Sequence, residues 1–344
     1  MSTGETFNEV AFRPVYSDIE SRSEIDTSTN LGGIILDLPI ISANMKDITG
    51  PNMVLSMAIN GGMGILHRFG SIEDSVENYI DTVSLFNNSK EKLTLNKNSI
   101  YPIGVSVGVK EYEMNRFDAL YEKGAKIFTV DVAHGHHILV KNMIQYMRNK
   151  AGKEIYIIAG NIATVNGAKD LKEWGADIIK VGIGPGARCV TRKNTGVGVP
   201  QLKAIRDIKN AYNDLPIISD GGIRHTGDIP KALKYSDSVM VGSYIAGTSE
   251  TPGHVFENDD GKFYKVYGGS ASGERKVENG NKNNFVEGVV STVEFRGHVK
   301  HILRKTKDCL QSSMSYAGSR NLEEFRLKSV LENVSSGYKS ESRL

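Results

Sequence analysis

Short apolar runs alternate with amphipathic stretches from about residue 35 to residue 245. Eight runs have the length and β-branched content of buried strands. These predicted strands are Pro39–Asn44, Met63–His67, Pro102–Val107, Ile127–Val132, Ile155–Gly160, Ile178–Gly182, Pro216–Asp220 and Ser238–Ser243. Helical patterns between them include Asn52–Ile59, Val140–Met147, Gly167–Trp174 and Asp228–Leu233. The alternation indicates parallel strands buried on both faces. Eight such units predict a single (β/α)8 TIM barrel over residues 1–344, with an open Rossmann-like sheet as the alternative.

Two segments depart from this alternation. Ile183–Val199 follows the sixth predicted strand, and Gly247–Thr292 follows the eighth. Residues 268–290 are rich in Gly, Ser, Asn and Lys. Loops of this length in a compact domain are usually functional lids or disordered segments. We therefore expect an active-site flap at residues 268–290, followed by a C-terminal helix at about Val299–Gln311.

Composition narrows the function classes. The chain has 344 residues, of which 39% are hydrophobic and 24% charged, as in ordinary globular proteins. The net charge of +2 predicts no nucleic-acid or membrane partner. No apolar run is long enough for a membrane span, and Met1–Arg13 lacks a signal-peptide pattern. Two cysteines do not suggest a disulfide scaffold, so we expect a reducing, cytoplasmic location.

Polar and glycine clusters follow most of the predicted strands. They are Ser42–Met45, His67–Arg68, Asp131–His136, Gly160–Asn161, Gly182–Gly186, Asp220–Gly222 and Gly242–Ser243. In a barrel the carboxyl ends of the strands share one rim, where active sites lie. A single cluster is typical of a turn, whereas seven on one rim predict a shared site.

The turns after the last two predicted strands are candidates for a phosphate site. Gly221–Gly222 and Gly242–Ser243 lie where barrels commonly bind phosphate. Glycine allows backbone N–H groups to approach phosphate oxygens, and a helix N-terminus adds favourable partial charge. Tight turns explain each glycine pair alone, but not both pairs beside Asp220. The Asp220 carboxylate could accept hydrogen bonds from both hydroxyls of a ribose.

The loop from Gly182 to Arg192 carries the strongest chemical signal. Its glycines allow tight turns with inward carbonyls, which could hold a monovalent cation. Cys189 follows them with Arg188 and Arg192 nearby, and positive neighbours favour a nucleophilic thiolate. The alternative is a small buried cysteine, which Cys309 fits in its helical pattern. The polar surroundings of Cys189 favour the nucleophile.

These motifs resemble the IMP dehydrogenase and GMP reductase superfamily over about Ser21–Gly318. The matching stretches are Ser21–Glu24, Ser42–Met45, Asp131–Gly135, Gly182–Cys189, Thr195–Gly198, Ser219–Arg224 and Gly268–Ser272. Together the cysteine loop and the Asp-Gly-Gly motif are highly specific.

The resemblance favours the reductase branch of the superfamily. Dehydrogenases typically carry CBS modules after the second strand, and residues 68–101 are too few to hold them. Dehydrogenase flaps also contain an Arg-Tyr pair, which is absent between Gly273 and Glu287. Asn142–Gln145 and Gln311–Gly318 look like bacterial GMP reductases, whereas Gly196–Gln201 reads like a dehydrogenase.

The resemblance implies conversion of GMP and NADPH to IMP, ammonia and NADP. Cys189 would attack purine C2 and expel ammonia, which gives a covalent thioimidate that hydride then reduces. Ammonia must leave protonated, so a proton donor is needed beside the cysteine. The matching positions assign this relay to Thr191 and Glu287.

The resemblance also implies the binding residues. Those for the substrate are Asp220, Gly221, Gly222, Gly242, Ser243, Gly269, Ser270, Ala271 and Gly288. Those for the cofactor are Ser21, Arg22, Arg68, Asp131, Val132, Ala133, Ile183 and Gly184, with Ser315 and Gly318 of a neighbouring subunit in a homotetramer. Potassium would bind the carbonyls of Gly184, Gly186, Cys189 and Arg192.

Some positions depart from the family pattern. Ala187 stands where many relatives have a phosphate-contacting serine, Ser270 where many have methionine, and Asn283–Asn284 where the animal enzymes have Tyr-Arg. Phosphate contacts and cofactor preference therefore stay open at these positions. A dehydrogenase without CBS modules, a catalytically silent nucleotide-binding regulator, and a related or deoxy purine substrate remain alternatives.

Overall fold

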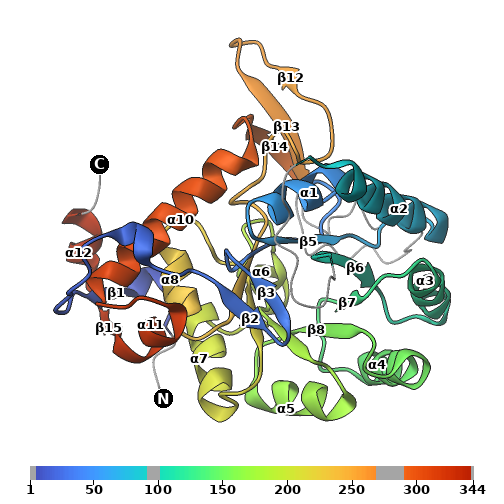
Figure 1. The fold of residues 1–344 in the computed structure, drawn as a ribbon, viewed down its shortest axis with the longest axis horizontal. Coiled ribbons are helices and arrows are strands. Elements are labelled where there is room, and N and C mark those ends of the chain that lie inside the picture. The colour runs from blue at the N-terminus through green and yellow to red at the C-terminus, as the bar shows by residue number, and fades with distance from the viewer. Residues whose placement is uncertain (1–4, 91–100, 269–289, 342–344) are drawn as a thin grey trace.

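Eight parallel strands form a closed barrel, as the alternation predicts (Figure 1). The computed structural model describes residues 5–90, 101–268 and 290–341. The barrel strands are β4 (Ile40–Ser42), β5 (Met63–Leu66), β6 (Ile103–Val107), β7 (Ile127–Asp131), β8 (Tyr156–Ile162), β9 (Ile178–Val181), β10 (Ile217–Asp220) and β11 (Ser238–Val241). They pair in chain order, and β11 closes the ring against β4. The TIM-barrel prediction is confirmed, and the open-sheet alternative is wrong.

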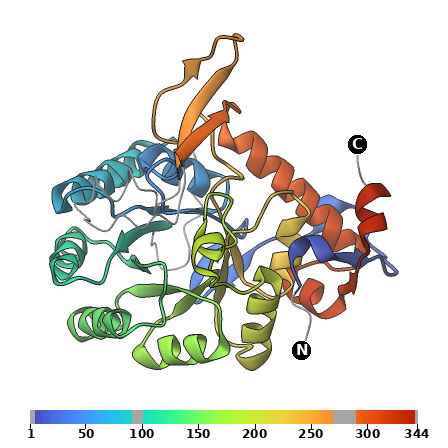
Figure 2. The same cartoon turned by 180° about the vertical axis from the view of Figure 1, so that it is seen from behind.

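Helices surround the barrel in both views (Figures 1 and 2). They are α1 (Pro51–Ile59), α2 (Ile72–Asn88), α3 (Glu111–Glu122), α4 (Ile138–Ala151), α5 (Val165–Trp174), α7 (Gln201–Ala211), α8 (Asp228–Leu233) and α10 (Val299–Tyr316). Local signals set several ends. Ser71 and Asp74 form a capping box at the start of α2, and Gly175 ends α5 in the left-handed conformation. In the described chain no helix is long and apolar enough to cross a membrane.

The barrel core is apolar with a few polar positions. Every residue of β4, β5, β6, β9 and β11 is buried, which explains their continuous apolar runs. The side chains of Ile41, Ile65 and Phe128 are fully buried. Lys180 in β9 is a charged residue in this otherwise apolar strand, and it is only 3% exposed. A buried lysine of this kind needs charged partners.

A hairpin closes the amino-terminal end of the barrel. It consists of β2 (Thr29–Leu31) and β3 (Ile34–Leu36), joined by Gly32 and Gly33 at positive φ. A Cβ on Gly33 would lie 2.7 Å from the Tyr156 hydroxyl, at the start of β8. The turn therefore sits against the bottom of the strands, where it leaves room only for glycine. The alternation did not predict this hairpin, because its strands lie outside the repeating unit.

The two ends of the chain pair with each other. Strand β1 (Val10–Arg13), after the short helix η1 (Phe7–Glu9), runs antiparallel to β15 (Val330–Asn333). Helix α11 (Leu322–Lys328) packs here, and the Phe12 and Phe325 rings meet edge to face with centroids 5.1 Å apart. Helix α12 (Ser336–Glu341) follows. Nothing in the local pattern predicted this long-range pairing.

The two irregular segments contain more regular structure than expected. A short helix α6 (Thr191–Thr195) lies within Ile183–Val199. Strands β12 (Phe256–Glu257), β13 (Phe263–Gly268) and β14 (Val290–Glu294) form an antiparallel sheet that projects from the barrel (Figure 2). The prediction of a loop through Gly247–Thr292 is wrong at these strands, where cross-strand hydrogen bonds order the chain. Most of the predicted flap, residues 269–289, lies outside the described residues.

Candidate active site

A cavity of about 460 Å³ opens at the carboxyl ends of the barrel strands. Residues at the tips of most of these strands line it, and six of the seven predicted rim clusters contribute to it, all but Gly242–Ser243. Among its lining residues are Asn44, Arg68, Asp131, Asn161, Lys180, Cys189, Thr191, Asp220 and Tyr267. A cavity of this size suits a drug-sized or nucleotide-sized ligand.

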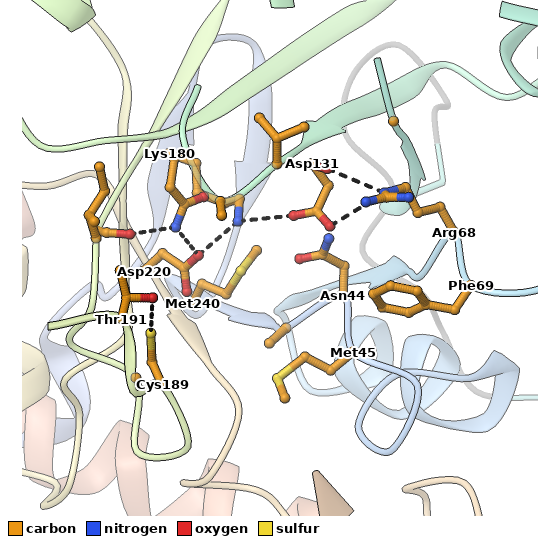
Figure 3. A pocket seen from close by; sticks show the side chains of 18 of the residues that line it. Asn44, Met45, Arg68, Phe69, Asp131, Lys180, Cys189, Thr191, Asp220 and Met240 are labelled. Carbon is orange, nitrogen blue, oxygen red and sulfur yellow. Dashed lines mark hydrogen bonds and ion pairs between the residues drawn. The ribbon is translucent and has the colours of Figure 1, made fainter. Parts of the chain in front are cut away.

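Lys180 joins two carboxylates across the floor of the cavity (Figure 3). Its Nζ lies 2.8 Å from Asp220 Oδ2 and 3.6 Å from Asp131 Oδ1. Burial lowers the pKa of Lys180, but the charges of Asp220 and Asp131 outweigh it and raise the pKa above its usual value. Lys180 therefore stays charged and fixes Asp131 and Asp220, which come from the tips of β7 and β10.

Asn161 and Arg68 extend this network to either side. Asn161 Nδ2 donates to Asp220 Oδ2 at 2.8 Å and to the Gly182 carbonyl at 2.7 Å. Arg68 donates from Nε to the Asp131 carbonyl at 3.2 Å and lies 3.8 Å from its carboxylate. The network therefore orients both aspartates toward the cavity before any ligand binds.

The cysteine loop places a thiol at the same cavity. The Cys189 N–H donates to the Gly186 carbonyl at 3.0 Å, which forms a tight turn. The Cys189 thiol donates to the Thr191 hydroxyl, with Sγ 3.1 Å from Oγ1 (Figure 3). Both side chains are only partly buried, so a ligand in the cavity can reach them. A nucleophile and a proton-accepting hydroxyl thus lie side by side.

Arg192 holds this loop together from within. Its guanidinium donates to the carbonyls of Ile183 and Val199, on opposite sides of the loop. A Cβ on Gly184, whose φ is +83°, would lie 2.5 Å from Arg192 Cγ, so the close packing requires glycine. Burial lowers the pKa of Arg192, against an opposing effect of Cys189.

The structure brings ten of the predicted site residues together at the cavity. The predicted residues that line the cavity are Cys189, Thr191, Asp220, Arg68, Asp131, Val132, Ala133, Ile183, Gly184 and Gly186. Gly221, Gly222, Gly242 and Ser243 do not line it. A Cβ on Gly221 would touch Pro185 and Gly186, and Ser243 lines a separate cavity of about 310 Å³.

The remaining predicted residues fall elsewhere. Ser21 and Arg22, at the helix η2 (Arg22–Glu24), lie beside the end of α10, where the Arg22 guanidinium carbon is 5.8 Å from the Tyr316 ring centre. Ser315 and Gly318 are within two residues of Tyr316 in the sequence. None of the four predicted cofactor residues in this region, Ser21, Arg22, Ser315 and Gly318, lines the cavity. Gly269, Ser270, Ala271, Glu287 and Gly288 lie outside the described residues.

Sequence reasoning missed Lys180 and Tyr267 as site residues. Lys180 stands in an apolar run, and a lysine inside a buried strand is itself a signal that charged partners lie nearby. Tyr267 precedes the predicted flap, and only the fold of β13 brings it to the cavity. Burial raises the pKa of Tyr267 to about 12.

Comparisons with known proteins agree with this geometry. The family model described as IMP dehydrogenase / GMP reductase domain matches residues 4–344. A GMP reductase of Bacillus subtilis is 39% identical over 325 residues, which cover 93% of each chain. A GMP reductase of Lactobacillus delbrueckii subsp. bulgaricus is 37% identical over 93% of this chain and 92% of its own.

A solved structure has the same fold. It is a variant of GMP reductase from Trypanosoma brucei in complex with guanosine 5′-monophosphate. The TM-score is 0.90 at 27% identity, over 100% of this chain and 98% of that one. The chain is therefore an oxidoreductase of the IMP dehydrogenase/GMP reductase family.

Proposed function

We propose that the chain catalyses the NADPH-dependent reductive deamination of GMP to IMP and ammonia. The observation that carries this proposal is the Cys189–Thr191 pair in one cavity with the Asp131–Lys180–Asp220 network, in which Lys180 is buried. Relatives at 37–39% identity over most of the chain bear the name GMP reductase, which supports the same substrate.

Cys189 is the proposed nucleophile. Its Sγ forms a bond to purine C2, and its proton passes toward Thr191, the acceptor of its hydrogen bond. The C2–N bond then breaks, and the amino group leaves as ammonia after it gains a proton. The product of this half-reaction is a thioimidate on Cys189. The proposed relay continues to Glu287, which lies outside the described residues.

NADPH, when bound, supplies the hydride that reduces C2 and allows the C–S bond to break. The residues proposed to hold it are Arg68, Asp131–Ala133 and Ile183–Gly184. Two buried side-chain oxygens of the same cavity, Asn161 Oδ1 and Glu113 Oε1, have no hydrogen-bond partner in the described chain. Such acceptors fit a ligand that brings amide or hydroxyl donors, as a nicotinamide nucleotide does.

Asp220 is the proposed anchor for the substrate ribose. Its Oδ2 accepts hydrogen bonds from Lys180 and Asn161, which leaves Oδ1 for the substrate diol. Lys180 also holds Asp131 on the cofactor side, so one ammonium group sets the relative position of both proposed ligands. Gly221, Gly222, Gly242 and Ser243 are the proposed phosphate contacts at the adjoining turns.

A potassium ion is proposed on the carbonyl oxygens of Gly184, Gly186, Cys189 and Arg192. Two of these oxygens already accept a backbone hydrogen bond at 3.0 Å, Gly186 from Cys189 and Arg192 from Gly196. Each keeps a second lone pair, which fits a monovalent cation. Rates in potassium, sodium and choline salts at equal ionic strength test this, and equal rates in all three would exclude a potassium requirement.

A homotetramer in a reducing cytoplasm is also proposed. Arg22 and Tyr316 form an exposed pair away from this chain's cavity, where they could serve the cavity of a neighbouring subunit. Light scattering should then give about four times the chain mass of 37.7 kDa. A monomer mass would contradict both the tetramer and the shared cofactor site. Both cysteines are free, which suits a reducing compartment.

The decisive experiment compares Cys189→Ala with Cys309→Ser. We expect loss of NADPH absorbance with GMP, with IMP and ammonia as products, in the parent protein and Cys309→Ser. Cys189→Ala should lower kcat by at least about 10³-fold, because the covalent step is lost. Cofactor reduction with IMP and NAD instead would make the protein a dehydrogenase. Inactivity of the parent protein in both assays would contradict both activities.

A further inference from the structure

Arg188 is a positively charged residue of the cavity that has no role in the proposed mechanism. It lines the cavity directly before Cys189, and its guanidinium carbon lies 5.3 Å from the centre of the Tyr267 ring. Its Nε is buried without a hydrogen-bond partner, and within the described chain Arg188 forms no ion pair. A buried donor without a partner is costly, so this geometry suits an anionic ligand.

Tyr267 connects this guanidinium to one of the two turns proposed for phosphate, Gly242–Ser243. A Cβ on Gly242 would lie 3.4 Å from the Tyr267 hydroxyl, and Ser243 is close enough to lower the pKa of that phenol. The ring that carries Arg188 on its face therefore touches the Gly242–Ser243 turn at its hydroxyl end. Burial raises the pKa of Tyr267 to about 12, with Arg188 opposing, so the phenol keeps its proton at neutral pH.

Neither Ala187 nor the two glycine turns supply a positively charged side chain for a phosphate. Ala187, the residue before Arg188, is exposed and has no polar side-chain atom that could contact a phosphate. The turns at Gly221–Gly222 and Gly242–Ser243 supply backbone N–H groups and one hydroxyl, but no positive charge. A guanidinium binds phosphate oxygens in a bidentate manner that a hydroxyl cannot reproduce.

We propose that Arg188 binds the 5′-phosphate of the purine nucleotide, from the face of Tyr267 and next to Gly242 and Ser243. This inference rests on the proposed function, because it assigns the phosphate contact of that same substrate. Arg188 is thereby a residue that distinguishes nucleotides from nucleosides. Its position next to Cys189 links phosphate binding to the placement of the thiol.

The test is a comparison of GMP and guanosine binding by calorimetry in a Cys189→Ala background, where no turnover occurs. Arg188→Gln should weaken GMP binding by about 10- to 100-fold and leave guanosine binding within about 2-fold. Arg188→Lys should restore part of the loss, because it returns the charge without the bidentate geometry. Lys193→Gln, which removes an exposed charge from the same loop, is the matched control and should not change GMP binding.

The other outcomes separate the inference from the proposed function. Equal losses for GMP and guanosine would mean that Arg188 shapes the whole cavity, and no loss for either would exclude a phosphate contact. Both would overturn the inference and leave the proposed function intact. Failure of the Cys189→Ala parent to bind GMP would overturn the proposed substrate and the inference with it. Thermal unfolding of each variant checks that the fold is retained.

Discussion

At the scale of single residues, the site depends on one lysine buried between two acids. Lys180 is 3% exposed in an apolar strand and contacts Asp220 and Asp131 through one ammonium group. Charges removed from water are tolerated only when they are paired, so the three side chains form a unit. The unit fixes acidic groups on both sides of the cavity in one arrangement.

We predict that Lys180→Met lowers the free energy of unfolding by about 3 kcal/mol, because it removes the one cation that the Asp131 and Asp220 carboxylates share. Urea denaturation monitored by circular dichroism measures this loss. Lys172→Met is the matched control, since Lys172 pairs with Asp214 at an exposed site and should cost less than about 1 kcal/mol. Equal losses in the two variants would refute a special role for the buried lysine.

The Lys180 contribution should depend on pH in a defined direction. The folded-state pKa of Lys180 is raised, so its stabilising effect is fully present below its unfolded pKa of about 10.4. The effect is lost as the pH rises through the higher folded-state pKa. The stability difference between the parent protein and Lys180→Met should therefore be constant from about pH 7 to 9 and decrease above about pH 10.5. A difference that grows at alkaline pH would contradict this assignment.

At the scale of elements, the segment from the end of β9 to the C-cap of α6 contains glycines whose environments differ. Gly182 has a φ of +154°, and a Cβ there would lie 2.1 Å from the Asp220 carbonyl oxygen. Gly196 also has positive φ, at +72°, but its Cβ position is open. Gly182 therefore allows the tips of β9 and β10 to approach closely, whereas Gly196 is needed only for the left-handed backbone conformation of its turn.

We predict that Gly182→Ala lowers kcat/KM for GMP at least about 10-fold, because the added methyl displaces the tip of β10 and with it Asp220. Gly196→Ala should cost only about 1 kcal/mol of stability, from its left-handed conformation, with little loss of activity. Steady-state kinetics and thermal unfolding of both variants provide the comparison. Similar kinetic losses in both would mean that backbone conformation, not crowding at Asp220, controls activity.

At the scale of the whole molecule, the ends of the chain close the structure away from the cavity. Strands β1 and β15 pair beside α11, and the Phe325 ring is fully buried against Phe12. None of these residues lines the cavity. Stability in this region and chemistry at the mouth of the barrel are therefore separable.

We predict that Phe325→Ala lowers the free energy of unfolding by about 3–5 kcal/mol and leaves kcat of the folded protein unchanged. Leu327→Ala, at a side chain that is 79% exposed, is the control and should be nearly neutral. Denaturant unfolding and initial rates at a temperature where both variants are folded measure the two effects. A large loss of kcat in folded Phe325→Ala would show that the terminal strands influence the cavity.

The sequence alone determined the repeating unit and the chemistry at its strand tips. Apolar runs such as Ile127–Val132 indicate buried strands because side-chain burial leaves a local pattern, and eight such units predict a barrel. The same local information picks out Cys189 and Asp220, since their types and neighbours suit particular reactions. The glycine loop is readable for the same reason, because glycine reports backbone conformations that other residues avoid.

Only the tertiary structure decided which distant residues meet. Lys180 gains its partners because closure of the barrel brings the tips of β7, β9 and β10 together, and no local pattern encodes that closure. The pairing of β1 with β15 and the contact of Arg188 with Tyr267 are likewise set by packing between segments far apart in sequence. Periodicity reports burial along one segment, whereas partners are selected by the shape and charge of the whole fold.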